Sequence, residues 1–312
     1  MLFCCSGLLQ SRRNRPLVGV LILFVLVLFV VVCAYFGWAM PYVFKVGSSL
    51  FGRSDSALAL DHYQVAIDAL PIAGVEENAS GLTYHSGRNT LFSVINRPPQ
   101  VIELSLDGVL LHSWPVDGVT DLEGITHIQG DEFFLVDERL QQLIHVRVRF
   151  DEGQNPIVTH DRPRLTVAAE VPGNLGFEGV SWNDRNNRLF VVKEKDPLRL
   201  LEFRGFAEIV HGGRVDLDIR EWRLGAPLAY FLRDLSSVSY HEGSGMLLLL
   251  SDESRLVLEL GDDHKPLSML VLRRGWHGLK RDIPQAEGVA VGAGNSIFVI
   301  SEPNLFYRFD RN

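Results

Sequence analysis

The sequence predicts an all-β fold: a five-bladed β-propeller of four-stranded antiparallel blades, preceded by one N-terminal transmembrane helix. Three observations support this prediction. A short phrase recurs five times along the chain, each copy has the pattern of a β-hairpin, and a long apolar stretch without charge precedes the first copy. We therefore expect a cytoplasmic tail over residues 1–16, a membrane anchor over 17–40, a linker over 41–60 and the propeller over 61–312.

The predicted anchor runs from Leu17 to Met40 and contains no charged residue. At about 1.5 Å per residue, such a helix is roughly 36 Å long, enough to cross a hydrocarbon layer of about 30 Å. Arg12, Arg13 and Arg15 precede it and no acidic residue does, so the positive-inside rule places the N-terminus in the cytoplasm and the propeller outside. A cleaved signal peptide is the alternative, but the apolar run is long and no A-x-A site follows.

The composition excludes a disulfide-stabilised domain and a nucleic-acid-binding protein. All three cysteines, Cys4, Cys5 and Cys33, lie before or within the predicted anchor, so the propeller has no disulfide framework. After residue 40 the chain carries 27 basic and 38 acidic side chains, a formal charge of −11. Such a surface repels nucleic acid and favours cations, and we expect no nucleic-acid partner.

Each copy of the phrase reads as a strand, a turn rich in Gly, Asn or Asp, and a denser apolar strand. Further β-type segments follow each hairpin, which predicts four strands per repeat. After the last copy only the strand "LFYRFDR" remains, and the segment "HYQVAIDAL", His62 to Leu70, is expected to complete that blade and close the ring. The copies are "NASGLTYHSGRNTLFSVIN", "DLEGITHIQGDEFFLVDE", "GFEGVSWNDRNNRLFVVKE", "DLSSVSYHEGSGMLLLLSDE" and "QAEGVAVGAGNSIFVISE".

Acidic residues recur at two positions of the phrase. The third position holds Ser80, Glu123, Glu178, Ser236 and Glu287, spaced 43, 55, 58 and 51 residues apart, directly before each predicted inner strand. In a ring of blades, the three carboxylates would meet at one mouth of the central channel. Their mutual repulsion favours protons or a cation, and their all-oxygen chemistry favours Ca²⁺. The alternative is that each glutamate accepts hydrogen bonds from the backbone of the next blade.

The second acidic position ends the second strand of four copies. Its members are Glu138, Glu194, Glu253 and Glu302. Because they recur whatever residue begins the first strand, they predict a structural contact, with a contribution to the cation site. The candidate metal ligands are therefore Glu123, Glu178 and Glu287, joined by Glu138, Glu194 and Glu302.

The common catalytic signatures are absent from the chain: it has no G-x-S-x-G, H-E-x-x-H, P-loop, C-x-x-C or EF-hand motif. A basic stretch, "RRGWHGLKRDIPQ" from Arg273 to Gln285, lies just before Glu287. It predicts either an anion-binding loop beside the cation site or solvated charges on a long loop.

The run "QAEGVAV...NSIFVISEPNLFYRF", with "LFSVINRPP", "DLEGI", "GFEGV" and "LSDESR", resembles the SdiA-regulated, YjiK-like family of bacterial envelope proteins. The resemblance covers roughly residues 60 to 310. It implies a five-bladed propeller, distantly similar to NHL-repeat proteins, that binds calcium and is anchored in the inner membrane with the propeller in the periplasm. The Glu-Gly pairs are more weakly similar to calcium-dependent lactonases, which have six blades.

Three functions remain open at this point. The propeller is expected to be a non-catalytic module that binds an unknown envelope ligand or protein. The alternative is a metal-dependent hydrolase of lactone or ester type, in which the ion polarises the carbonyl. A purely structural ion, with signalling through the anchor, is the third.

Overall fold

The computed structural model describes residues 15–35, 58–151, 153, 155–167, 176–195, 197–205, 216–222, 224, 231–261 and 265–311. The chain forms two compact units, Met1–Gly52 and Arg53–Asn312.

Helix α1 (Arg15–Tyr35) belongs to the first unit. Its side chains over residues 18–31 are exposed and, apart from Gly19, apolar. Over the described residues, no helix combines the length and the apolar character that a membrane crossing requires. The predicted anchor over 17–40 thus coincides with α1 in part, and its last residues, 36–40, lie outside the described residues.

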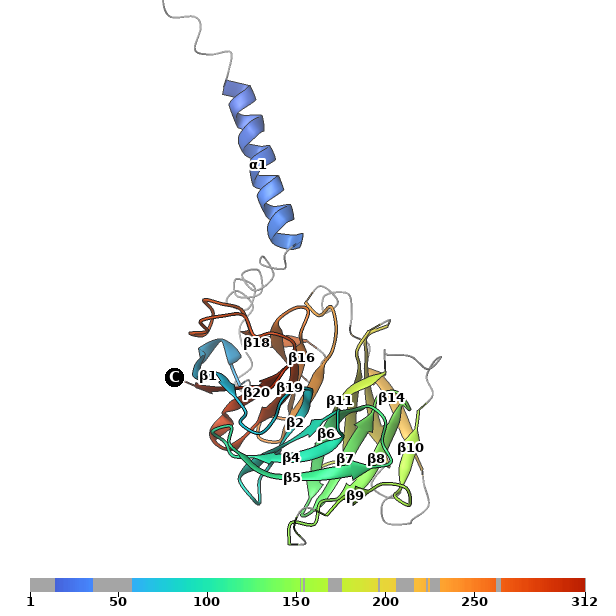
Figure 1. Ribbon diagram of the computed structural model, residues 1–312. Helices are drawn as coiled ribbons and strands as arrows, with labels where there is room; N and C mark the ends of the chain where they lie inside the picture. Colours follow the sequence, from blue (N-terminus) through green and yellow to red (C-terminus); the bar gives the residue numbers. More distant parts are fainter. Residues whose placement is uncertain are drawn as a thin grey trace, which may run out of the picture. The chain divides into compact units, whose positions relative to one another are not determined.

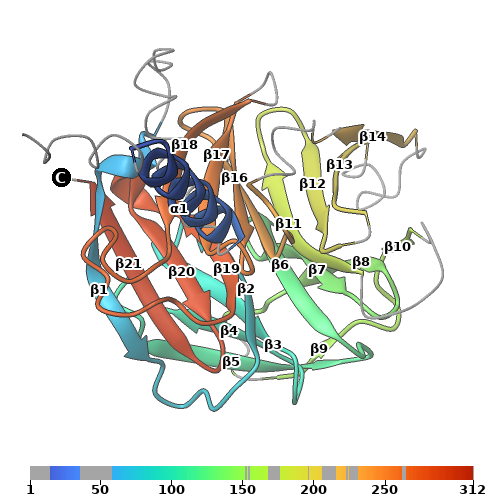
Figure 2. The same cartoon turned by 90° about the horizontal axis from the view of Figure 1, so that it is seen from above.

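The second unit consists of five sheets, antiparallel except for one short added strand, that are arranged around a common centre, as Figures 1 and 2 show. The inner strands are β2 (Ala79–His85), β6 (Leu122–Gln129), β11 (Phe177–Asn183), β15 (Ser237–His241) and β19 (Ala286–Val291). The second strands are β3 (Thr90–Ile95), β7 (Glu132–Asp137), β12 (Arg188–Lys193), β16 (Met246–Ser251) and β20 (Ile297–Ser301). The third strands are β4 (Gln100–Leu104), β8 (Gln142–Arg147), β13 (Arg199–Arg204), β17 (Leu256–Leu260) and β21 (Leu305–Arg311). The outer strands are β5 (Leu110–Asp117), β10 (Arg164–Thr166), β14 (Asp218–Trp222), β18 (Pro266–Val271) and β1 (Tyr63–Pro71). Two short 3-10 turns, Leu60–His62 and Ala293–Asn295, lie beside the last blade.

The ring is closed in the way that the sequence predicts. Strand β1 pairs with β21, so the first and the last strand of the propeller share one sheet. Each inner strand contacts the inner strands of both neighbouring blades, and β19 contacts β2. The predicted five-bladed propeller is therefore confirmed, and the closing strand is Tyr63–Pro71 where the sequence suggested His62 to Leu70.

One blade has an additional strand that the sequence did not reveal. Strand β9 (Ile157–Val158) arises from the connection between β8 and β10 and pairs in parallel with β5, so the first sheet has five strands where four were predicted. The addition covers the outer edge of the first blade, which is otherwise open to unwanted pairing. Two residues of β-type sequence in a long loop give too weak a pattern to be recognised.

The core lies between neighbouring blades. The second strands are buried along nearly their whole length, because each has a blade on both faces, and this accounts for their continuous apolar runs. One apolar cluster joins the first two blades around Phe92 and Phe133, and another joins the next pair around Phe134 and Trp182. A further cluster joins the fourth and fifth blades around Leu248 and Tyr307.

The segment that leads into β1 is also part of the propeller. Leu58 and Leu60 are buried in the cluster of the fourth and fifth blades. The backbone N–H of Leu58 donates to Glu259 Oε1 over 2.6 Å, and that of Leu60 donates to Ser268 Oγ over 3.0 Å. The end of the predicted linker over 41–60 is thus fixed to the fourth blade.

Candidate functional site

Glu123, Glu178 and Glu287 each lie in a β-bulge at the beginning of an inner strand. In all three blades the register between the inner and the second strand shifts across the glutamate, so that it has no directly paired residue. A bulge bends the strand locally and redirects the side chain of its extra residue. The recurring bulge therefore gives the three carboxylates a common orientation that regular pairing would not.

The glycine that follows each glutamate allows neighbouring blades to approach closely. A Cβ atom on Gly124 would lie 2.7 Å from the carbonyl oxygen of Glu178, and one on Gly179 would lie 2.7 Å from Cα of Ser237. Both distances are shorter than van der Waals contact permits, so only glycine fits without a backbone shift. Each Glu-Gly pair thus has two effects. The bulge redirects the carboxylate of the glutamate, and the glycine lets neighbouring blades lie close enough to bring the carboxylates together.

The serines at the equivalent positions act as connections between blades. Ser80 Oγ donates to the carbonyl of Glu123 over 2.8 Å, and Ser236 Oγ donates to the carbonyl of Ala286 over 2.7 Å. The serines thus link neighbouring blades by donating to a backbone carbonyl, whereas the alternative for the glutamates was acceptance of a bond from a backbone N–H.

The three glutamates line one pocket of about 300 Å³. The predicted residues Glu194 and Glu302 border the same pocket, so five of the six candidate ligands surround one space. The other lining residues are Lys195, Asp234, Ser236, Asp252, Glu253 and Gln285.

Burial and mutual repulsion make the ionised form of these carboxyls unfavourable. Burial raises the pKa of Glu178 well above its ordinary value, and the charges of Glu123, Glu138 and Glu287 add to the effect. Burial likewise raises the pKa of Glu287 to about 9 and that of Glu123 to about 7. Within the described part of the chain, no Lys or Arg side chain forms an ion pair with these three glutamates. Ionisation of all three consequently requires another source of positive charge.

The sixth candidate, Glu138, lies beside Glu123 and not in the wall of the pocket. It is buried, and its Oε1 accepts a hydrogen bond of 3.0 Å from the backbone N–H of Gly176 in the next blade. Burial raises the pKa of Glu138, and the bond from Gly176 partly offsets this. Glu138 therefore makes the structural contact expected of the second-strand set.

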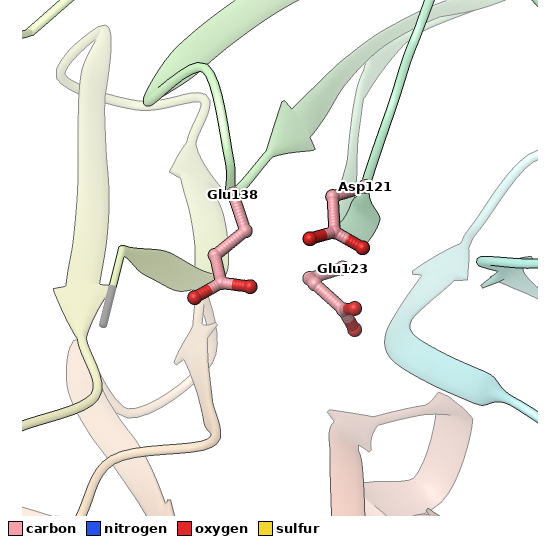
Figure 3. Close-up of side chains that lie close together, drawn as sticks. All are labelled: Asp121, Glu123 and Glu138. Carbon is pink, nitrogen blue, oxygen red and sulfur yellow. The ribbon is translucent and has the colours of Figure 1, made fainter. Parts of the chain in front are cut away.

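The sequence prediction missed Asp121, which forms a compact group with Glu123 and Glu138. One carboxylate oxygen from each residue lies within 4.8 Å of the others, and Figure 3 shows the three side chains close together. Asn96 Nδ2 donates to Asp121 over 2.8 Å and to Glu123 over 2.5 Å. Arg139 pairs with the second oxygen of Asp121 at 3.2 Å, so this carboxylate is partly neutralised already.

Asp234 is the second acidic residue that was missed, and it occupies the position of Asp121 in the fourth copy. It lines the pocket and accepts hydrogen bonds from Ser251 Oγ and from the backbone of Glu253. Both aspartates begin their copies of the phrase, two residues before Glu123 and Ser236. Alignment of the copies was therefore sufficient to find them.

The donor atoms of the pocket suit a hard cation. Carboxylates, a serine hydroxyl and an amide provide oxygen ligands, and no histidine or cysteine is among the lining residues. This chemistry fits Ca²⁺ or Mg²⁺ better than zinc. Lys195 forms ion pairs of 2.8 Å with Glu194 and with Glu253, which makes that side of the pocket less negative.

Several solved structures are similar to this chain in fold. A luciferin-regenerating enzyme matches 79% of this chain and 95% of its own, with a TM-score of 0.51 and 11% sequence identity. Regucalcin, a calcium-binding protein from Agrobacterium tumefaciens, matches 78% of this chain and 92% of its own, with a TM-score of 0.47 and 11% identity. A streptogramin B lyase matches 82% and 100%, with a TM-score of 0.47 and 10% identity. At these identities the likeness concerns the fold alone.

The family comparison agrees with the resemblance noted in the sequence. The model of the SdiA-regulated family matches residues 55–310, which include all five blades and the pocket. The chain therefore belongs to the SdiA-regulated family.

Proposed function

We propose that the propeller binds a calcium-type cation at the mouth of its channel and serves as a non-catalytic module that binds a ligand or partner of the cell envelope. The observation that carries this proposal is the convergence of Glu123, Glu178 and Glu287 on one pocket. Their ionised forms lack a basic partner among the described residues. A divalent cation supplies the missing charge, and calcium accepts the several oxygen ligands that the pocket offers.

Calorimetric titration of the metal-free protein with CaCl₂ and with MgCl₂ tests the cation. We expect Ca²⁺ to bind with release of protons, because the carboxyls with raised pKa must ionise. Glu178→Gln is expected to abolish binding. Glu221→Gln is the matched control, because the half-exposed side chain of Glu221 lies in the outer strand of the same blade. This variant should bind Ca²⁺ as the wild type does. Equal binding by both variants would refute the proposed site.

The non-catalytic role is supported by the chemistry of the lining residues. Ser236 is the serine among them, and its hydroxyl donates to the backbone of Ala286. Among the described residues that line the pocket, no histidine is present to act as a general base. The described lining residues therefore offer oxygen ligands for an ion and include no activated nucleophile.

A metal-dependent hydrolase of lactone or ester type is the second candidate. It is favoured by one observation: carboxyls whose pKa is raised to about 7 and about 9, at Glu123 and Glu287, lie in the range useful for proton transfer. A screen of lactones and aryl esters with and without Ca²⁺ decides between the two. Calcium-dependent turnover that is lost in Glu178→Gln would favour the hydrolase.

We also propose that the protein is anchored in the inner membrane, with its propeller in the periplasm. The support comes from the sequence, in which 24 residues without charge follow Arg12, Arg13 and Arg15. Alkaline extraction of membranes tests the anchor, and protease access in spheroplasts tests the side. Release of the protein by alkaline carbonate would contradict the anchor.

A further inference from the structure

The long connection from β18 to β19 contains a basic loop, residues 273–282. It has four basic side chains and one acidic side chain, a formal charge of +3, although the chain after residue 40 has a formal charge of −11. Three of the basic residues, Arg274, Lys280 and Arg281, are exposed. Within the described part of the chain, none of these three side chains forms an ion pair. Their charges are therefore available to a partner outside the propeller.

The backbone of the basic loop is fixed on two sides. Leu279 and the nearby Ile283 are buried in the apolar cluster of the fourth and fifth blades. On the other side, Nδ1 of His277 donates to the carbonyl of Tyr63 over 2.8 Å, and the backbone N–H of Val65 donates to the carbonyl of His277 over 2.8 Å. The exposed charges are thus carried on an ordered support, and ordering the loop adds little to the cost of binding.

The acidic residues beside the basic loop have other contacts. Asp282 forms an ion pair with Arg255 and accepts a hydrogen bond of 2.7 Å from the backbone of Arg274. Asp68 accepts one of 3.3 Å from the backbone of Lys280. Neither of these acids forms an ion pair with an exposed basic side chain of the loop.

The basic loop lies where the linker enters the propeller. Leu58 and Leu60 are buried in the same apolar cluster as Leu279. The predicted anchor ends at Met40, so residues 41–57 connect it to this cluster. Seventeen residues span at most about 60 Å. The linker therefore keeps the basic loop within reach of the membrane that holds the anchor, and a short tether gives an effective concentration in about the millimolar range.

We propose that Arg274, Lys280 and Arg281 bind the anionic phospholipid headgroups of the periplasmic leaflet, so that the propeller docks on the membrane through the basic loop. The inference rests on the proposed membrane anchor, which keeps the propeller close to the bilayer. Each basic side chain near an anionic bilayer strengthens binding about fivefold. Trp276 lies between these residues in the sequence, and tryptophan is enriched at the membrane interface.

The reactivity of Lys280 tests the proposal in the full-length protein, reconstituted into liposomes of phosphatidylcholine with and without phosphatidylglycerol. A membrane-impermeant reagent acetylates exposed lysines, and mass spectrometry gives the rate at Lys280 relative to that at Lys265. Lys265 is exposed and lies at the opposite end of β18, so it is the internal reference. We expect phosphatidylglycerol to lower this ratio at least fivefold, and about 1 M NaCl to restore it, because salt screens the attraction.

The variant Arg274→Gln/Arg281→Gln removes two charges and keeps Lys280 as the reporter. Docking should weaken about 25-fold, and the protection of Lys280 by phosphatidylglycerol should disappear. Arg274→Lys/Arg281→Lys keeps the charges and should keep the protection. The matched control is Arg162→Gln/Arg220→Gln, which removes two charges from the second and third blades and should also keep it.

Two results would overturn the proposal: equal reactivity of Lys280 in both kinds of liposome, or equal protection in the wild type and in Arg274→Gln/Arg281→Gln. Unchanged thermal unfolding of that variant shows that a loss of protection does not result from misfolding.

Alkaline carbonate extraction of the same liposomes separates docking from anchoring. If the protein stays in the membrane and Lys280 is equally reactive in both kinds of liposome, the anchor stands and docking is refuted. If carbonate releases the protein, the anchor is refuted. Docking then requires that the protein sediments with liposomes at neutral pH and low salt only when they contain phosphatidylglycerol, and that Arg274→Gln/Arg281→Gln does not; absence of this sedimentation refutes docking as well.

Discussion

In two sets of buried glutamates in the same propeller, the pKa values are shifted in opposite directions. Glu103 and Glu202 lie in third strands and are 0% and 2% exposed, yet their pKa values are lowered. Glu123, Glu178 and Glu287 lie in inner strands, and their pKa values are raised. Burial opposes ionisation in both sets, so burial alone does not explain the difference.

The difference lies in the donors that surround each carboxylate. Glu103 accepts hydrogen bonds from Arg88 Nε at 2.7 Å, from Thr90 at 2.7 Å and from His112 at 2.8 Å, and together they outweigh the effect of burial. Glu202 is held in the same way by Trp222 and Arg204. A carboxylate that the blade itself neutralises stabilises the fold, whereas one that the blade leaves without a basic partner is available to a cation.

The largest change in stability is expected for Glu103 and Glu202, the carboxylates that have basic partners. Glu202→Gln leaves the guanidinium groups of Arg188 and Arg204 without their common partner, and we expect the free energy of unfolding to fall by about 3 kcal/mol. Urea denaturation of the metal-free protein measures it. The response of the same variant to Ca²⁺ should be preserved. A variant as stable as the wild type would remove the distinction between the two sets.

Among the described residues, Glu123, Glu178 and Glu287 lack a basic partner, and their expected contribution to the free energy of unfolding appears only when calcium is present. At a free Ca²⁺ concentration about 100 times its Kd, the wild type should gain about 2.7 kcal/mol, and Glu178→Gln should gain nothing. Without metal, Glu178→Gln should be at least as stable as the wild type, because the raised pKa of Glu178 already favours the uncharged form that glutamine resembles. Thermal unfolding with Ca²⁺ and with EDTA tests both statements; destabilisation of the metal-free variant would place Glu178 in the structural set.

The dependence of stability on pH follows from the direction in which the pKa values of Glu123 and Glu287 are shifted. The pKa of Glu123 is about 7 and that of Glu287 about 9 in the folded protein, against 4.5 ordinarily, so the folded state binds more protons between these values. Stability from this source is complete below about pH 4.5 and is lost as the pH rises through the folded values. We expect the free energy of unfolding to fall as the pH rises from about 5 to 8 without metal.

Saturating Ca²⁺ should reduce this slope, since the ion binds the ionised carboxyls. The matched comparison is Glu178→Gln, in which the slope should be smaller even with EDTA. If stability rose over this pH range in the wild type relative to the variant, the assignment of the raised pKa values would be wrong.

The smallest effect is expected at Lys195, which pairs with Glu194 and Glu253 at one side of the pocket. Its ammonium group competes with a bound ion for these carboxylates. Lys195→Met should therefore raise the affinity for Ca²⁺ by about threefold, in keeping with the modest value of exposed ion pairs. A calorimetric titration that showed weaker binding instead would indicate that Lys195 supports the site through its packing.

The internal repeat made the fold and the centre of the site predictable. Because each copy keeps the same hairpin, the sequence predicts that Glu123, Glu178 and Glu287 lie together, and in the structure they line one pocket. The partners of Glu103 and Glu202 could not be predicted, because they depend on how each third strand pairs with the strands on both of its sides. Strand β9 was missed for a related reason, since it pairs with β5 across two blades.

The joining of β1 to β21 has a consequence for biosynthesis. Among the strands of the propeller, residues 63–71 leave the ribosome first, yet their pairing partner, residues 305–311, is translated last. The earlier strand must therefore wait with an open edge while the other blades are made, and an open edge is prone to aggregation. We therefore expect that protection of this open edge in the nascent chain favours formation of the finished ring.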